Sequence, residues 1–416
     1  MLKYFSVKNF RSIREECILE FDENISDEPE FITNYLVGFS GANASGKTTI
    51  LLAISFTFWF MQNSFRMSEG NPVPVISFYG QEEEPTIFHI IFTKATSIDG
   101  IDKLIDYEYS VEIKNKNVIN EYLAYYPSGV EETVYLRKGK KIQFGDTAKS
   151  TVVYITDFED NLRENCSIVS YAALYKTQFV ARQCCNYNFI SSIPSLLENE
   201  MKFSIEMLKE IDGDENKREL FLDLLKIADI GIVDFSYESY NTEELEKILD
   251  YIRREKENEK IEKDIERYKN DGGFYSASFY HYLYGEKVRF SPEQESEGTL
   301  QFVAICYRIL NALEKGTLLI IDEVELKLHQ NLIAYLIGLF QNEHTNKYKS
   351  QLIFSFHNSL LMKFLKPEQL WFAEKNDNGS TELFSASHFD DIDDMNNKDL
   401  EKLYRIGRFG AKPRGI

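Results

Sequence analysis

The sequence predicts an α/β fold, and three features support this prediction. Residues 35–62 have the pattern of a buried strand, a glycine-containing loop and an apolar helix. Residues 317–323 form an apolar run that ends in Asp322 and Glu323, as is typical of a buried strand that ends at a site. Residues 86–144 divide into short runs rich in β-branched and aromatic residues. The chain therefore combines a core of strands and helices with an antiparallel β meander.

The composition limits the class of protein. The 416 residues are 43% hydrophobic and 27% charged, which is typical of a globular chain with several substructures. The net charge of −20 predicts no general attraction to nucleic acid or to anionic membranes, although it leaves room for a local basic groove. The five cysteines have no disulfide or metal spacing, no secretory signal is found, and residues 50–61 are too short to span a bilayer. We therefore expect a cytoplasmic protein.

The first 150 residues predict one lobe of the core. Strands are expected over residues 1–8, 17–21 and 35–40, followed by a buried helix over 48–62. A linker containing Pro72, Pro74 and Pro85 leads into the meander, for which we expect four or five strands. The simplest role for this meander is structural, as one wall of the lobe.

The remaining chain predicts an insertion and a second lobe. Residues 160–230 have helical patterns, and residues 241–270 predict a charged helical arm that ends at Asp271-Gly272-Gly273. Strands are expected over 274–290, 318–321, 351–356 and 370–374, with 381–385 completing a hairpin, and helices over 300–313 and 332–340. The predicted segments are residues 1–150, 151–285 and 286–416.

Residues 41–48, GANASGKT, match the phosphate-binding pattern GxxxxGK[ST]. Glycines let backbone N–H groups surround a phosphate at a helix N-terminus, where the helix dipole favours anions. Lys47 should reach the β- and γ-phosphates, and the Thr48 hydroxyl should bind Mg²⁺. The sequence thus predicts ATP and Mg²⁺ as ligands. The predicted nucleotide-binding residues of this segment are Gly41, Asn43, Ser45, Gly46, Lys47, Thr48 and Thr49.

Asp322 and Glu323 form the second half of this predicted site. Alone, such a pair is more often a solvated acidic turn, but the phosphate-binding loop changes that balance. Asp322 would bind Mg²⁺ together with Thr48, and Glu323 would act as the general base toward water. An acidic residue directly after Asp322 favours a hydrolytic site over one that only binds.

Residues 295–299, ESEGT, precede a predicted helix. One interpretation is simple capping, in which Ser296 or Thr299 binds the first free N–H groups. The other is a variant of the LSGGQ signature of ABC-type ATPases, because the segment begins 27 residues before Asp322. A serine hydroxyl and a helix N-terminus can bind a γ-phosphate, and in ABC geometry they serve the nucleotide of the other protomer. We therefore expect a homodimer or a higher oligomer built from dimers. The predicted signature residues are Ser296, Glu297, Gly298 and Thr299.

His357 ends the strand that follows Asp322-Glu323. A single histidine is usually structural, but this place is the switch position of ABC-type ATPases, where histidine contacts the γ-phosphate. We predict a catalytic role for His357, Glu323 and Lys47. The glutamine of the usual Q-loop stays open. Gln62, Gln81 and Gln178 are equally eligible.

The chain as a whole resembles the stand-alone ABC/SMC-like ATPases of bacterial phage defence, of the RloA, AbiL and AriA kind. Gln330 stands where this family usually has proline, and its basic stretch is reduced to Lys363 and Lys366. The matching segments are NFRS (9–12), GANASGKT (41–48), KIADIGIVDF (226–235), ESEGT (295–299), LLIIDEVELKLH (318–329), QLIFSFHNSLL (351–361), EQLWFAEK (368–375) and GRFGAKP (407–413).

This resemblance implies that Arg11 and Ser12 approach the nucleotide. It also implies an ATPase that senses infection through a phage-derived trigger and controls a separately encoded toxic effector, such as a nuclease. The alternative is an SMC/RecF-like ATPase of DNA repair, which the charge of −20 does not favour. A transporter subunit and a nucleotide-binding module without turnover are further possibilities that ESEGT and Glu323, respectively, argue against.

Overall fold

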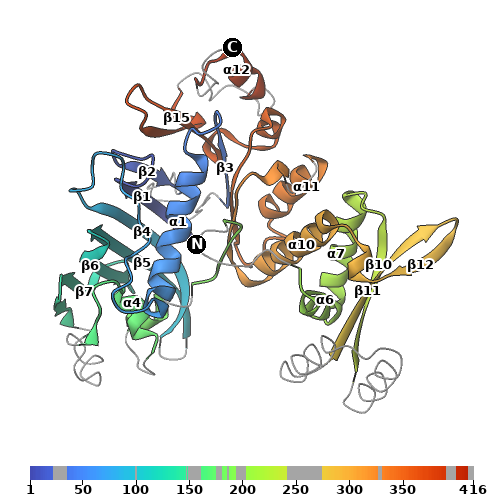
Figure 1. Cartoon of the computed structure of the whole chain (residues 1–416), viewed down its shortest axis with the longest axis horizontal. Helices are drawn as coiled ribbons and strands as arrows, with labels where there is room; N and C mark the ends of the chain where they lie inside the picture. Colours follow the sequence, from blue (N-terminus) through green and yellow to red (C-terminus); the bar gives the residue numbers. More distant parts are fainter. Residues whose placement is uncertain are drawn as a thin grey trace, which may run out of the picture. The chain divides into compact units, whose positions relative to one another are not determined.

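The structure is a computed structural model, and it forms two compact units (Figure 1). It describes residues 1–21, 35–98, 101–146, 148, 161–174, 180–184, 187–193, 203–240, 274–326, 330–389 and 400–410. The first unit comprises residues 1–200, 312–326 and 333–416, and the second comprises residues 201–311 and 327–332. These bounds differ from the three predicted segments: residues 161–193 belong with the first unit, and the ESEGT segment belongs with the second. The predicted arm (241–270) and Gln178 lie outside the described residues.

The first unit contains an antiparallel sheet that has seven strands within the described residues, in the order β2-β1-β4-β5-β6-β7-β8. The five meander strands β4 to β8 confirm the prediction for residues 86–144, and β1 extends the sheet by pairing with β4. The strands are β1 (Leu2–Lys8), β2 (Cys17–Glu20), β4 (Thr86–Ile98), β5 (Ile101–Lys114), β6 (Asn117–Tyr126), β7 (Glu132–Lys138) and β8 (Lys141–Phe144).

A buried ion pair fixes the meander from inside. The side chains of Glu121 on β6 and Arg137 on β7 are both 0% exposed and lie 3.3 Å apart. Glu121 also accepts hydrogen bonds from Tyr109, Tyr135 and the backbone N–H of Ile168. A buried charge pair is tolerated only when further hydrogen bonds satisfy it, as they do here. The pair therefore anchors the start of the following helical segment to the sheet.

A second sheet, of six strands among the described residues, has the order β16-β15-β3-β14-β13-β9. It is parallel from β15 to β9, and β16 is antiparallel to β15. Ile321 pairs with Phe354, so Asp322, which follows β13, and Ser355, the last residue of β14, lie at the same end of the parallel strands. The strands are β3 (Leu36–Ser40), β9 (Phe189–Ser191), β13 (Leu318–Ile321), β14 (Gln351–Ser355), β15 (Leu370–Lys375) and β16 (Thr381–Ser385).

Helix α1 (Lys47–Asn63) lies alongside the first sheet (Figure 1). Its sequence is apolar on all sides and most of its residues are buried, as predicted. Phe56 contacts Phe88 of β4, with ring centroids 4.9 Å apart, and Phe58 stacks on Tyr187 at 4.6 Å. Within the described residues of 161–193, the helices are short. They are α4 (Ile168–Ala172) and α5 (Val180–Cys184).

The second unit pairs helices with a three-stranded antiparallel sheet, β10-β11-β12, in its described part. Strand β9 lies between two of the helical stretches predicted within residues 160–230 and was not predicted. The last of these stretches was predicted to extend too far, because the chain turns before β10. The turn follows from the left-handed backbone of Asp229 and Gly231, whose φ values are 54° and 81°. The elements are α6 (Ile205–Asp212), α7 (Glu215–Ile227), β10 (Ile232–Tyr240), β11 (Phe274–Leu283), β12 (Glu286–Phe290) and α10 (Glu297–Lys315).

Two helices complete the described chain, α11 (Gln330–Gln341) and α12 (Leu400–Ile406). Four of the five cysteines are described; all four are buried, and none of these four forms a disulfide. In the described part of the chain, no helix combines the length and the apolar character that crossing a membrane requires.

Candidate functional site

The predicted phosphate-binding loop connects β3 to α1 in the first unit. Gly41, Ala44 and Gly46 have φ values of 149°, 61° and 115°, which bend the loop around the start of α1. The ammonium of Lys47 donates to the carbonyl oxygens of Gly41, at 2.8 Å, and of Ala42, at 3.0 Å. The lysine therefore lies folded against its own loop.

The loop packs closely against the β15–β16 hairpin. A Cβ atom on Gly46 would lie 2.2 Å from the Thr381 hydroxyl oxygen, so only glycine fits there. The Thr381 hydroxyl donates to the carbonyl oxygen of Ser45 at 2.9 Å and lies 2.9 Å from the Ser12 hydroxyl. Ser12 in turn donates to Thr49 at 3.1 Å. Thr381 of the hairpin thus fixes the phosphate-binding loop through its contacts with Ser45 and Gly46. The sequence did not predict this role of Thr381.

The structure places Ser12 within this network and Arg11 outside it. Arg11 is exposed and lies over the ring of Phe10, at 5.9 Å, and its backbone N–H donates to Ile76. Asn43 is exposed on the loop. Contact of these residues with a nucleotide stays a prediction.

Asp322 is held by three side-chain hydroxyls. Thr48 donates to its Oδ2 at 2.9 Å, Ser355 donates to its Oδ1 at 2.6 Å, and Ser192 accepts from its backbone N–H at 2.9 Å. The Ser355 hydroxyl also accepts from the Glu323 N–H at 2.7 Å. Ser355 therefore orients both acidic residues from the neighbouring strand. The sequence signal for it was its place at the end of the apolar run 351–355.

The side chains of Glu323 and His357 lie close together just beyond the ends of the neighbouring strands β13 and β14. The distance between Glu323 Oε1 and His357 Nε2 is 3.6 Å. The backbone N–H of His357 donates to Glu325, whose second carboxylate oxygen is buried and has no hydrogen-bond partner in the described structure. Sequence reasoning missed Glu325, which lies two residues after Glu323 in the short helix Val324–Leu326.

Lys47 lies near three carboxylates. Burial lowers the pKa of Lys47, and the carboxylates of Asp322, Glu325 and Glu323 partly oppose this shift. An anion that replaced the loop carbonyls around the ammonium would be paired with a desolvated cation. The site is thus suited to a phosphate group that arrives together with a divalent cation.

The residues also fit Mg²⁺ and a nucleotide. Thr48 and Asp322 offer one hydroxyl and one carboxylate, which is the usual share of protein ligands for Mg²⁺ beside phosphate oxygens and water. The buried Ser45 hydroxyl has no hydrogen-bond partner in the described structure and is a spare donor in the loop. Among the described residues, no three His, Cys, Asp or Glu side chains form a metal-binding cluster.

The ESEGT segment lies at the start of α10 in the second unit. Helix α10 begins at Glu297, three residues before the predicted start, because Ser296 caps it. The Thr299 N–H donates to the Ser296 hydroxyl at 3.0 Å, so the capping interpretation is confirmed. Ser296, Glu297 and Gly298 are exposed, and Thr299 is partly exposed. The cap leaves this helix end accessible, and a role in binding a partner's nucleotide stays a prediction.

The candidates for a Q-loop glutamine have structural contacts. Gln62, near the end of α1, donates to the carbonyl of Tyr187 at 2.7 Å. The backbone carbonyl of Gln81 accepts from Asn9 at 3.0 Å. Neither contact involves the phosphate-binding loop, and the choice stays open.

A protein-family model described as "AAA domain, putative AbiEii toxin, Type IV TA system" matches residues 36–363, more than three quarters of the chain. The chain belongs to this family. It is therefore an AAA-family domain, and its fold is that of an ABC-type P-loop NTPase. The SMC head domain from Thermotoga maritima matches with 13% sequence identity over 92% of this chain and 98% of that chain, with a TM-score of 0.38. No curated protein matches the chain.

Replacing Ser355 with alanine should reduce nucleotide hydrolysis by this AAA domain by about 10- to 100-fold, as losing a partner that orients a metal ligand generally does. Asp322 would lose a 2.6 Å hydrogen bond, and the Glu323 N–H would lose its acceptor. Phosphate release titrated with Mg²⁺ measures this, and the half-saturating Mg²⁺ concentration should rise. Ser170→Ala, at another buried serine that accepts a backbone N–H, is the matched control. An unchanged Mg²⁺ dependence in Ser355→Ala would remove Ser355 from the site.

Proposed function

We propose that this protein hydrolyses ATP with Mg²⁺. The observation that carries this proposal is the convergence of four side chains where the parallel strands β13 and β14 end. Thr48 lies 2.9 Å from Asp322, and Glu323 lies 3.6 Å from His357. Thr48 and Asp322 would bind the cation, which neutralises phosphate charge when bound. Lys47 and the loop N–H groups would bind the β- and γ-phosphates.

Glu323 is the proposed general base. It would accept a proton from the attacking water, because its carboxylate is partly exposed and the Ser355 hydroxyl fixes its backbone. His357, two residues after the neighbouring strand β14, would donate a hydrogen bond to the γ-phosphate. The two side chains are close enough to act on one water molecule and one phosphate.

We further propose that the active form is a head-to-tail homodimer. In support, Ser296 and Gly298 lie exposed at the N-terminus of a 19-residue helix. A Cβ atom on Gly298 would meet only the Ser296 hydroxyl, at 3.7 Å, so a phosphate could approach the backbone there. Each protomer would supply this helix end to the nucleotide held by its partner.

The biological role that we propose is control of a separate toxic effector, such as a nuclease, in an anti-phage system of the RloA, AbiL or AriA kind in the cytoplasm. The family description, which names a type IV toxin–antitoxin system, supports a role in such a pair. The sequence segments quoted above support the narrower assignment. ATP turnover would set whether the effector is held or released when a phage-derived trigger appears.

The test of this role is expression from the native operon, with and without Glu323→Gln. We expect the product of a neighbouring gene to co-purify, and phage plating to fall only when both genes are present with Glu323 intact. Native mass spectrometry gives the partner and its stoichiometry. Plating that does not depend on either gene would contradict the role. Salt-sensitive binding of DNA by the isolated protein would instead support the SMC/RecF-like alternative.

A further inference from the structure

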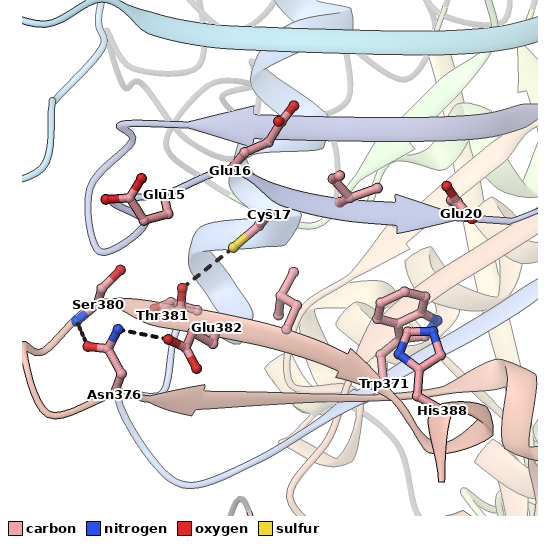
Figure 2. A pocket seen from close by; sticks show the side chains of 12 residues that line it. Glu15, Glu16, Cys17, Glu20, Trp371, Asn376, Ser380, Thr381, Glu382 and His388 are labelled. Carbon is pink, nitrogen blue, oxygen red and sulfur yellow. Dashed lines mark hydrogen bonds between the residues drawn. The ribbon is translucent and has the colours of Figure 1, made fainter. Parts of the chain in front are cut away.

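A cavity of about 690 Å³ lies between two sheet edges of the first unit. One wall is β2 with the residues before it, and the other is β16 with the adjoining hairpin turn. Figure 2 shows the two strands running side by side in the same direction, with the cavity between them. The Cys17 thiol donates to the carbonyl oxygen of Thr381 at 3.5 Å, a contact that joins the two walls. Trp371 and His388 stand at the other end (Figure 2).

Within the described part of the chain, both walls offer strand backbone that no other strand pairs with. Among the described strands, β2 pairs only with β1, and β16 pairs only with β15. Phe21 donates to Lys3 at 2.9 Å, so the alternate residues Ile18 and Glu20 direct their N–H and C=O groups away from β1.

The same reasoning applies to β16. Asn376 donates to Ser380 at 2.9 Å, and Leu383 therefore directs its backbone groups away from β15. An extended chain placed in the cavity would meet hydrogen-bonding partners on both sides. Free strand edges of this kind bind peptides by adding a strand to the sheet.

The side chains of the cavity are acidic. Four of the twelve lining residues are glutamates, and none is lysine or arginine. They come from both walls and from both ends (Figure 2). The glutamates are Glu15, Glu16, Glu20 and Glu382.

Burial, and then the charges of Glu382 and Glu16, raise the pKa of the Cys17 thiol to about 12, and the charge of Lys375 partly opposes this shift. Ile18 and Leu383 add apolar surface, along which the stem of a long cationic side chain can lie. The cavity is therefore complementary to cations carried on flexible aliphatic chains.

We propose that this cavity binds an extended segment of another protein that is rich in lysine and arginine. Its backbone would pair with β2 or β16, and its cations would meet the glutamates. Nucleic acid does not suit the cavity, because the same carboxylates repel phosphates. The cavity shares a residue with the support of the nucleotide site. Thr381, the first residue of β16, lines this cavity and also donates a hydrogen bond to the Ser45 carbonyl of the phosphate-binding loop.

The probe for this proposal is a fluorescent eight-residue peptide that alternates valine with lysine or arginine. Its affinity is measured by fluorescence anisotropy with the full chain. The double variant Glu15→Lys, Glu20→Lys should weaken binding by about tenfold or more, because two attractive contacts become repulsive. The control is Glu83→Lys, Glu343→Lys, which changes the net charge equally at two exposed positions outside the cavity. The control should bind the peptide within about twofold of the unchanged protein.

A second peptide tests strand pairing without changing the protein. Methylation of alternate backbone nitrogens removes N–H donors and keeps every charge, and it should weaken binding by about tenfold. Equal binding by both double variants, equal binding of the methylated peptide, or no binding at millimolar peptide would each overturn the proposal. Dissociation of a dimer by Glu15→Lys, Glu20→Lys would also overturn it, because the cavity would then be an interface between copies.

Discussion

Glu323→Gln should lower the rate of ATP hydrolysis by roughly 10²- to 10⁴-fold, the usual contribution of a general base. The amide has the same shape as the carboxylate and keeps the position beside His357, but it cannot accept a proton from water. ATP should still bind, because Lys47, Thr48 and Asp322 are unchanged. With hydrolysis blocked, the ATP-bound dimer should accumulate. Phosphate release and light scattering after size-exclusion chromatography measure the two effects.

The control for this experiment is Glu343→Gln, at an exposed carboxylate in the turn after α11. It should hydrolyse ATP at the rate of the unchanged protein and show no ATP-dependent dimer beyond it. Normal turnover in Glu323→Gln would disprove the assignment of Glu323 as the base. If turnover is lost but no stable dimer forms, the assignment of Glu323 as the general base stands. That result would argue against completion of the nucleotide site by a second protomer.

Mixing two inactive variants should restore about a quarter of the activity. Lys47→Ala lacks the cation of the phosphate-binding loop, and Ser296→Arg blocks the start of α10 in the same chain. Each alone should retain about 1% or less of the turnover, because Lys47→Ala removes a cation that stabilises the transferred phosphate and Ser296→Arg obstructs the helix start that would close over it. If loop and signature come from different protomers, every mixed dimer has one intact site of two. Random pairing makes half of the dimers mixed, and this gives the expected quarter.

The mixing experiment is read as phosphate release against the molar ratio of the two variants. Activity should peak at equal amounts. A control mixture of Lys47→Ala with Asp322→Ala should stay inactive, because both changes fall on the same half of the site. Absence of recovery in the first mixture, with both variants folded by circular dichroism, would mean that each chain completes its own site.

The sequence predicted those parts of the site whose residues are adjacent in the chain. Residues 41–48 carry their own geometry, because a strand, a glycine-containing loop and a helix specify one another locally. Asp322 and His357 were found for a similar reason, since each ends an apolar run. The antiparallel meander was also visible, because alternation along each strand is a local property.

The parts that the sequence did not predict depend on distant pairing. Strand β9 has only three residues and exists because Leu318 and Phe189 pair in the parallel sheet. Ser355 and Thr381 act through contacts with Asp322 and Ser45. The sequence signal for Ser355 was its place at the end of an apolar run, and nothing near Thr381 in the sequence marks it. In the sequence, Glu325 has the same appearance as any solvated acidic residue. Its role depends on the hydrogen bond that it accepts from the backbone N–H of His357.

The tight contact between Gly46 and Thr381 has a consequence for how such sequences change over time. The two residues are 335 positions apart, yet a side chain at position 46 would overlap the threonine. A larger residue at position 381 would likewise press on a loop whose shape glycine alone permits. We therefore expect substitutions at positions 46 and 381 to be tolerated only in matched combinations. The phosphate-binding loop and the β15–β16 hairpin should therefore change together during evolution. A recombination event that joined the loop of one protein to the hairpin of another would place side chains that do not fit against each other.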